Sequence, residues 1–367
     1  MKRGMCKRQK KINVVMVRPL GKGGKGGIDR VVQNQIDAFI ATDIRIFEIV
    51  TRGPHGLIAA RFYLLFAILK LIAIYLLQGV DLVHINLSSN GSVVRKKIII
   101  RICQKLAIPY VIHLHGSRFR SYWDGLAERE SRQLTRCFEE ATTVFALGEV
   151  WRQYIISKAP SARVELLLNA TPPAPNKEAS PQRKSSVTKI LFLGEIGQRK
   201  GAFDLIEAVS SLDSQKLGSW ELTLAGNGDL EKAAGLISKK NLDHRVALPG
   251  WVDEHTAEAL LTQAHILVLP SYDENLPMSV IEGMAHGLAI VTTPVGATAS
   301  IIRHEDNGLL IPPGDITALT DALKVLICDI PLAQSLGQQA RQFHTENLTI
   351  SIHVERLAHL WREAAGK

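Results

Sequence analysis

The chain has 367 residues, more than one hydrophobic core usually serves, because single cores stop growing near ~250–300 residues, so two domains are expected. Apolar residues make up 46% and charged residues 22%, close to the average of soluble globular proteins, which excludes disordered and fibrous chains. The four cysteines lie far apart with no C-x-x-C pair, which favours a reducing, cytoplasmic setting over a disulfide framework or a zinc site.

The net charge of +9 is unevenly distributed. Residues 1–175 carry 27 Lys and Arg against 12 Asp and Glu, whereas the remainder carries 17 against 23. A basic first half suggests an anionic partner, such as a phosphorylated substrate, an acidic membrane surface or a nucleic acid.

The first half alternates short apolar runs with helical patterns, which indicates βαβ units around a parallel sheet. Helices are expected at residues 28–40 and 91–106. The expected strands are residues 11–17, 44–50, 81–86, 110–115 and 142–147.

The most apolar stretch is Phe62 to Leu77, which contains Lys70 and is shorter than the ~20 residues of a spanning helix. We expect it not to cross a membrane. It is either a buried helix of the first domain or an interfacial helix with Arg61 and Lys70 at headgroup level. The basic N-terminus lacks a secretory cleavage site. That arm and the cations of residues 95–105 favour an anionic leaflet, although charge runs are usually solvated.

Residues 169–189 are rich in Pro, Ser and charge and carry no apolar period, which is typical of a linker. The alternation then resumes, so two doubly wound domains facing one another across a cleft are expected. Their bounds are placed at 1–175, 176–188 for the linker, 189–345, and 346–367 for a final amphipathic helix. The strands expected in the second half are residues 189–194, 221–226, 245–250, 266–270, 289–293 and 308–312, with helices beginning near 202, 230, 256, 278 and 316.

A glycine cluster follows the first strand and precedes the first helix. Glycines there let a backbone approach an anion at the helix N-terminus. Gly21, Gly23 and Gly26 match G-x-G-x-x-G, with Glu48 placed as a ribose-binding acid, so an NAD-dependent oxidoreductase is one hypothesis. The match is weak, because any glycine-rich run fits it, and a merely mobile loop is the alternative.

In YVIHLHG, His115 ends the expected strand just before Gly116, where functional residues of α/β sheets gather. A neutral imidazole there can hold a hydroxyl or stabilise a developing charge. His113, deeper in the strand, is expected to be a core histidine.

In the second half, Gly194 ends a strand and the pair Arg199 and Lys200 opens a helix, a favourable site for a diphosphate. Further along, Glu274 lies in a loop and Glu282 about one turn into the next helix. Two carboxylates so placed can accept hydrogen bonds from a hydroxyl-rich ligand, with helix N–H groups such as that of Leu276 facing an anion. The lack of positive charge beside them argues against a nucleic-acid groove.

These segments together resemble the retaining glycosyltransferases of family 4, which have the GT-B fold of two Rossmann-like domains. The resemblance covers about residues 189–326. It rests on the Lys200–Gly201 pair, Gly226-x-Gly228, Pro249-Gly250-Trp251-Val252, the E-x7-E pair Glu274 and Glu282, and VTTPVG ending at Gly296. In the first half only Gly26–Gly27 and His115–Gly116 match.

The resemblance implies a role for each matching residue. Glu274 would contact donor-sugar hydroxyls, Glu282 the nucleotide ribose and Lys200 the diphosphate, with His115 also catalytic. The base would stack near Trp251. The further donor-binding residues are expected to be Arg199, Gly27, Gly194, Gly226, Asn275 and Leu276.

One departure concerns Glu195, which stands where the family usually has an arginine on the diphosphate. A carboxylate there would repel a diphosphate, so either Arg199 supplies the missing charge, which we favour, or donor binding is weakened. The final segment, 351–365, reads as an amphipathic helix that in such proteins often returns to the first domain.

The implied reaction is transfer of a hexose from a nucleotide diphosphate sugar, with UDP or GDP as the carrier, to a hydroxyl of a growing glycan. No cofactor, metal or nucleic acid is expected, and no Asp-x-Asp is present to hold a metal. The basic first domain suggests a lipid-linked acceptor in surface polysaccharide synthesis, at the inner face of the cell membrane. The alternatives are the oxidoreductase, a noncatalytic polyanion-binding protein, or another GT-B enzyme such as an epimerase or phosphorylase.

Overall fold

The computed structural model describes residues 11–21, 27–39, 43–54, 56–175, 187–214 and 219–366. The chain divides into two compact units, one of Met1–Leu168 with Ile350–Lys367 and the other of Asn169–Thr349. The boundary falls a few residues before the one expected from composition, and most of the expected linker lies outside the described residues.

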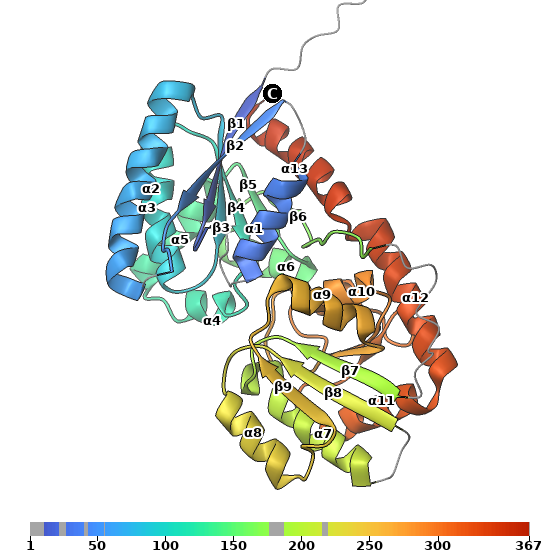
Figure 1. The fold of residues 1–367 in the computed structure, drawn as a ribbon. Coiled ribbons are helices and arrows are strands. Elements are labelled where there is room, and N and C mark those ends of the chain that lie inside the picture. Colours follow the sequence, from blue (N-terminus) through green and yellow to red (C-terminus); the bar gives the residue numbers. More distant parts are fainter. Residues whose placement is uncertain are drawn as a thin grey trace, which may run out of the picture. The chain divides into compact units, whose positions relative to one another are not determined.

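The first unit is an α/β domain whose elements alternate as the apolar runs predict (Figure 1). Its strands are β1 (Ile12–Arg18), β2 (Ile44–Val50), β3 (Leu82–Leu87), β4 (Tyr110–Leu114), β5 (Thr143–Ala146) and β6 (Val164–Leu166). Its helices are α1 (Gly27–Ala38), α2 (Gly56–Gln78), α3 (Gly91–Lys105), α4 (Phe119–Asp124), α5 (Glu128–Glu139), α6 (Glu149–Lys158) and α13 (Ile350–Ala364).

The sheet of the first unit is parallel, in the order β2-β1-β3-β4-β5-β6. Its central strands are buried on both faces, which explains their continuous apolar sequences. The sequence missed β6, which has three residues with Glu165 in the middle and so carries no apolar run. The chain winds outward in both directions from β1 and β3, so the topological switch point lies between these two strands.

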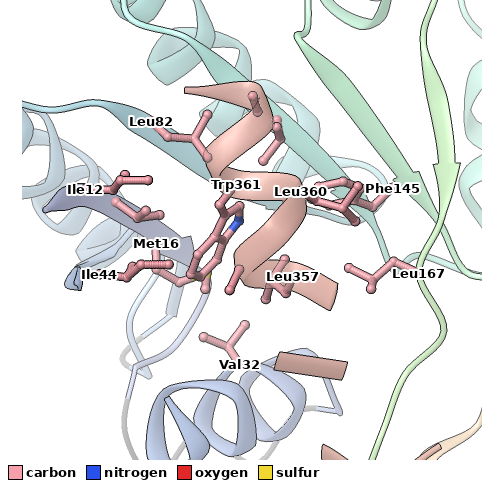
Figure 2. Close-up of a cluster of buried hydrophobic side chains, with 14 residues drawn as sticks. Ile12, Met16, Val32, Ile44, Leu82, Phe145, Leu167, Leu357, Leu360 and Trp361 are labelled. Carbon is pink, nitrogen blue, oxygen red and sulfur yellow. The ribbon is translucent and has the colours of Figure 1, made fainter. Parts of the chain in front are cut away.

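The last helix, α13, is part of the core of the first unit. Figure 2 shows its Trp361 and Leu357 among Ile12 and Met16 of β1 and other apolar side chains. The Trp361 ring is fully buried, and its Nε1 donates a hydrogen bond of 2.9 Å to Nδ1 of His84. The helix therefore contributes to the fold of the first unit although almost two hundred residues separate it from the rest.

The apolar stretch 62–77 forms most of α2, and it is buried along one face only. A stripe of Ala60, Ala67, Leu71 and Ile74 is buried, at positions that fall on one face of a helix. The opposite face is apolar and open to solvent. The side chains on it that are more than half exposed are Phe62, Leu65, Phe66, Leu69, Leu76 and Leu77.

The second unit is also an α/β domain. Its strands are β7 (Val187–Leu193), β8 (Ser219–Ala225), β9 (Val246–Gly250), β10 (Ile266–Leu269), β11 (Ala289–Thr292) and β12 (Leu309–Leu310). Its helices are the short η1 (Gln198–Lys200) and η2 (Thr298–Ser300), with α7 (Ala202–Ser214), α8 (Leu230–Lys239), α9 (Glu254–Gln263), α10 (Met278–Ala285), α11 (Ile316–Cys328) and α12 (Ile330–Asn347).

The second sheet is parallel and runs β12-β11-β10-β7-β8-β9. The six strands and five helix starts expected from the sequence are all present, to within two residues at each strand start and helix start. The switch point lies between β7 and β10, so the loops that leave these two strands flank the crevice where α/β sheets bind ligands.

Replacing Trp361 by alanine should destabilise the first unit by about 3–5 kcal/mol, because it empties a large buried site and leaves His84 without its donor. Urea unfolding measures the change. His359→Ala is the matched control, since His359 is exposed on the same helix and should change stability by less than ~0.5 kcal/mol. An equal, small effect of both substitutions would show that α13 is dispensable for the unit.

Candidate active site

The loop that leaves β7 brings two cations to the switch point of the second sheet. It runs through Gly194 into η1, which carries Arg199 and Lys200. Gly201 follows with φ +70°, and a Cβ there would lie 2.1 Å from the backbone oxygen of Pro270. Only glycine permits this close approach. The contact fixes η1 against the loop that leaves β10.

Glycines also hold the neighbouring loops in contact. Gly226, after β8, has φ +157°, and a Cβ there would lie 1.7 Å from the backbone oxygen of Gly194. A Cβ on Gly194 would in turn lie 2.9 Å from Cδ of Lys200. Gly226 is thus required by the close approach of the two loops, whatever it binds, whereas a Cβ on Gly194 would need the Lys200 side chain to shift.

The loop after β10 places Glu274 directly beside these cations. Nζ of Lys200 lies 2.7 Å from Oε1 of Glu274, and Nη1 of Arg199 lies 3.6 Å from the same oxygen. The hydroxyl of Ser271 donates to that oxygen at 3.3 Å. Glu274 is 9% exposed, so its charge is largely removed from water and depends on these partners.

A second contact fixes the backbone of the acid loop. Gly296 has φ +60°, and a Cβ on it would lie 2.2 Å from the backbone oxygen of Glu274 and 2.5 Å from that of Asn275. The N–H of Ala297 donates to the Asn275 oxygen at 2.6 Å. The glycine that ends VTTPVG is therefore needed for the position of Glu274.

Glu195 is held by Arg199. Oε2 of Glu195 lies 2.8 Å from Nη2 of Arg199, while Nη1 donates to the backbone oxygen of Asp273 at 3.0 Å. Burial disfavours the charge of Arg199, but the hydrogen bond to Glu195 and the charge of Glu274 outweigh it and raise the Arg199 pKa. The unusual acid thus pairs with the cation four residues along.

The remaining expected donor residues of the second unit lie around the same loops. Asn275 and Leu276 are buried next to Glu274, and the Leu276 backbone oxygen accepts from Nδ2 of Asn169 at 3.1 Å. Glu282 is the fifth residue of α10 and is 7% exposed. Trp251, after β9, keeps 49% of its surface exposed, as a ring that stacks on a ligand would.

In the first unit, His115 follows β4 and is held by Asn86. Nδ2 of Asn86 donates to the Val17 oxygen at 3.0 Å, which turns Oδ1 toward Nε2 of His115 at 2.9 Å. Because a carbonyl oxygen only accepts, Nε2 carries the proton and Nδ1 is the acceptor. Burial, and then the charges of His84 and Lys96, hold the pKa of His115 well below its usual value, so the ring is neutral at pH 7.

The other expectations for the first unit have mixed outcomes. His113 is fully buried, as expected for a core histidine, and its ring lies 4.0 Å from that of His115. Gly27 opens α1, and a Cβ there would meet nothing within 4 Å, so packing does not require glycine. Gly23 and Gly26 lie outside the described residues. Oε2 of Glu48, the hypothetical ribose-binding acid, lies 3.0 Å from Nη1 of Arg18.

The sequence missed three polar residues at the switch point of the first sheet, namely Arg18, Asn86 and Lys96. All three are fully buried. Lys96 belongs to the run of cations at residues 95–105. Such runs are usually solvated, but the side chain of Lys96 is buried. Lys96 lies four residues after Ser92 and three before Ile99, both of which are buried. Residues at these spacings share one face of a helix, so the sequence contained a signal for the burial of Lys96.

Residues 174–343 match the family described as Glycosyl transferases group 1. The chain is 25% identical over 279 residues to an alpha-D-kanosaminyltransferase of Streptomyces kanamyceticus, covering 70% of this chain and 71% of the relative. It is 26% identical over 206 residues to the amylovoran biosynthesis glycosyltransferase AmsK of Erwinia amylovora, covering 54% and 50%.

Solved structures extend the likeness to both units. Sucrose-phosphate synthase from Thermosynechococcus elongatus superposes with a TM-score of 0.80 at 19% identity, covering 96% of this chain and 99% of that one. Anabaena HepE in complex with UDP and glucose gives 0.72 at 15% identity, covering 96% and 100%. The fold is GT-B. The family match covers nearly all of the second unit, and together with the related glycosyltransferases it supports a glycosyltransferase enzyme.

Proposed function

We propose that the protein is a retaining hexosyltransferase that moves a hexose from a nucleotide diphosphate sugar to a hydroxyl of a growing glycan, without a metal. The observation that carries this proposal is the meeting of Lys200, Arg199 and Glu274 at the switch point of the second sheet. Cations that can hold a diphosphate lie there within 4 Å of an acid that can hold the attached sugar.

The reaction needs a group that stabilises charge on the leaving diphosphate. The acceptor oxygen bonds to the anomeric carbon as the bond from that carbon to the diphosphate oxygen breaks. The acceptor proton passes to the departing diphosphate on the same face of the sugar, so the configuration is kept. Lys200 and Arg199 supply fixed positive charge to this leaving group. They are held in place before the substrate binds, which lowers the reorganisation that the step requires.

The other site residues receive roles that fit their positions. Glu274 accepts hydrogen bonds from sugar hydroxyls, and Glu282, on the first turns of α10, accepts from the ribose. The exposed Trp251 ring stacks on the base. His115, neutral with Nδ1 as an acceptor, binds a hydroxyl of substrate from the first unit.

The substrates are proposed from relatives. HepE was solved with UDP and glucose, and AmsK is named for synthesis of a polysaccharide, amylovoran. HepE supports a UDP-sugar donor, with a GDP-sugar as the alternative, and AmsK supports a glycan acceptor, which we propose is made for the cell surface. The oxidoreductase hypothesis is disfavoured because Glu48, its ribose-binding acid, pairs with Arg18.

We further propose that the acceptor is lipid-linked and that the protein binds the inner face of the cell membrane through α2. Residues Ala59–Gln78 are long and apolar enough to cross a membrane, with 22% of the most apolar window buried. One face of this helix, including Leu71, packs in the first unit. A helix packed on its own domain along one side is better suited to lie in the interface, with Arg61 and Lys70 near the headgroups.

Removing either member of the central ion pair should nearly abolish transfer. Lys200→Met and Glu274→Gln should each lower kcat by about a hundredfold or more, because each removes a charge that acts on the reacting sugar or its leaving group. Release of nucleoside diphosphate from the donor measures the rate. Lys239→Met, an exposed lysine on α8, is the matched control and should keep full activity. Full activity in a folded Lys200 or Glu274 variant would overturn the assignment.

The nucleotide that carries the donor sugar should be identified by how much it stabilises the protein against heat. UDP or GDP at 100 times its dissociation constant adds ~2.7 kcal/mol to the state that binds it and raises the melting temperature. ADP and NAD should have little effect. A thermal-shift panel of the four ligands makes the comparison, and stabilisation by NAD alone would move the nucleotide site to the first unit.

The exposed face of α2 should determine membrane binding. Phe66→Glu puts a charge on a side chain that is 70% exposed, so it should leave the fold intact and reduce flotation with vesicles of anionic phospholipid. Val325→Glu is the control, since Val325 is an exposed apolar residue on α11 of the second unit. If both variants float as the wild type does, α2 is not the membrane contact.

A further inference from the structure

Three cations gather in the first unit where the carboxyl ends of its strands meet the start of α3. Arg52 follows β2, and its N–H donates to the Pro19 oxygen at 2.9 Å, which ties it to the loop that leaves β1. Arg95 and Lys96 lie in the second turn of α3. The cluster therefore flanks the switch point between β1 and β3, where α/β sheets bind ligands.

Two pairs of these cations, Arg52 with Arg95 and Arg95 with Lys96, repel one another. Burial, and then the charge of Arg52, lowers the pKa of Arg95. Burial, and then the charge of Arg95, lowers the pKa of Lys96 to about 7, against the opposing attraction of Asp29. Like charges gathered in this way are unfavourable unless an anion compensates them.

The carboxylates nearby are already engaged. Oδ1 of Asp29 lies 3.3 Å from Nε of Arg18 and accepts from the N–H groups of Leu20 and Gly21. Glu48 lies 3.0 Å from Nη1 of Arg18. Both acids pair with Arg18, and only Asp29 also attracts Lys96. The positive charges of the cluster are left in excess.

Lys96 itself is fully buried, with Nζ 2.7 Å from the hydroxyl of Ser92. The charged or titratable groups that act on it are Arg95 from its own helix, Asp29 from α1 and His115 from the loop after β4. A neutral hydroxyl and one shared carboxylate are weak compensation for a buried ammonium. Replacement by an apolar side chain of similar volume would be the simpler way to fill the space.

Arg95 provides a second, independent observation. Its Nε is buried and has no hydrogen-bond partner among the described residues. Its Nη1 lies over Gly91, 3.1 Å from where a Cβ would stand, so the guanidinium folds across the start of α3, whose free N–H groups carry partial positive charge. Arg52 is exposed and Arg95 partly so, which leaves these two guanidinium groups open to a ligand above the buried Lys96.

We propose that Arg52, Arg95 and Lys96 form a binding site for a phosphate group in the first unit. Guanidinium groups bind phosphate oxygens in pairs, and an ammonium adds a point charge. The site takes a phosphate of the acceptor, and in this respect it rests on the function proposed above. It is separate in sequence and in unit from Lys200 and Arg199, which hold the donor diphosphate.

The helix proposed to contact lipid starts beside this site. Gly53, next to Arg52, has φ +67°, and a Cβ on it would lie 2.1 Å from Cε2 of Tyr63 in α2. The loop that carries Arg52 is thus packed on the first turns of α2. A phosphate joined to a lipid chain could reach the cations and the apolar face of α2 together, whereas a free phosphate would use the cations alone.

The test measures binding of inorganic phosphate by calorimetry. Lys200→Met is the background, so that binding of phosphate at the donor site of the second unit is weakened in every sample. Adding Lys96→Met should weaken phosphate binding at least about tenfold, since it removes a positive charge from beneath the two guanidinium groups. Lys105→Met is the matched control, being an exposed lysine on the same helix, and should change nothing. Unchanged binding in the Lys96 variant would overturn the proposal.

Two further measurements keep the result unambiguous. Arg95→Gln, at a partly exposed position, repeats the test should Lys96→Met fail to fold, and the same tenfold loss is expected. Phosphatidylcholine vesicles with and without polyprenyl phosphate then identify the source. Loss of the polyprenyl phosphate response in the Lys96 variant assigns the site to a lipid phosphate, and loss of the inorganic phosphate response alone assigns it to a soluble one. Failure of the proposed function would appear instead in the wild type, as no response to UDP or GDP.

Discussion

The ion pair between Lys200 and Glu274 spans the switch point of the second sheet and gives the site its form. Each partner comes from a loop that leaves a different strand, β7 or β10. Both side chains are mostly buried, so either charge alone would be costly, and each loop depends on the other for its position. Three glycines make the approach possible, because Gly201, Gly226 and Gly296 each meet a backbone oxygen where a Cβ would clash.

The same arrangement explains how the unusual Glu195 is accommodated. A carboxylate on the loop after β7 would repel a diphosphate if it stood alone. Paired with Arg199 it instead helps to orient a guanidinium whose other nitrogen is fixed by the Asp273 oxygen. The unusual Glu195 and the nearby Arg199 therefore act as a pair, while Lys200 is the cation that faces Glu274.

Both units are built on a parallel sheet with a switch point, but the charges at the two switch points differ. In the second unit, two cations are balanced by Glu195 and Glu274. In the first, Arg52, Arg95 and Lys96 exceed the acids that could balance them, because those acids pair with Arg18. This difference reflects the uneven charge of the sequence, in which the first half is basic and the second mildly acidic. Such a difference in charge is expected of two sites that bind different anionic substrates.

Much of the fold could be predicted because continuous apolar runs mark buried parallel strands, as in 44–50 and 289–293. β6 was missed because three residues carry no pattern. The burial of α2 could not be decided, since an apolar helix has the same sequence whether protein or another apolar phase covers it. Lys96 and Arg18 were missed because burial of a charge depends on partners distant in sequence, such as Asp29.

We propose above all that Lys200 recognises the diphosphate of the donor. The most direct measurement compares the affinities of UDP and UMP, or the guanosine pair if that base is the one bound, for the wild type and for Lys200→Met. The wild type should bind the diphosphate at least about tenfold more tightly than the monophosphate, because the β-phosphate contact is charge-assisted. The variant should lose most of this preference. A variant that keeps the full preference would contradict the proposal.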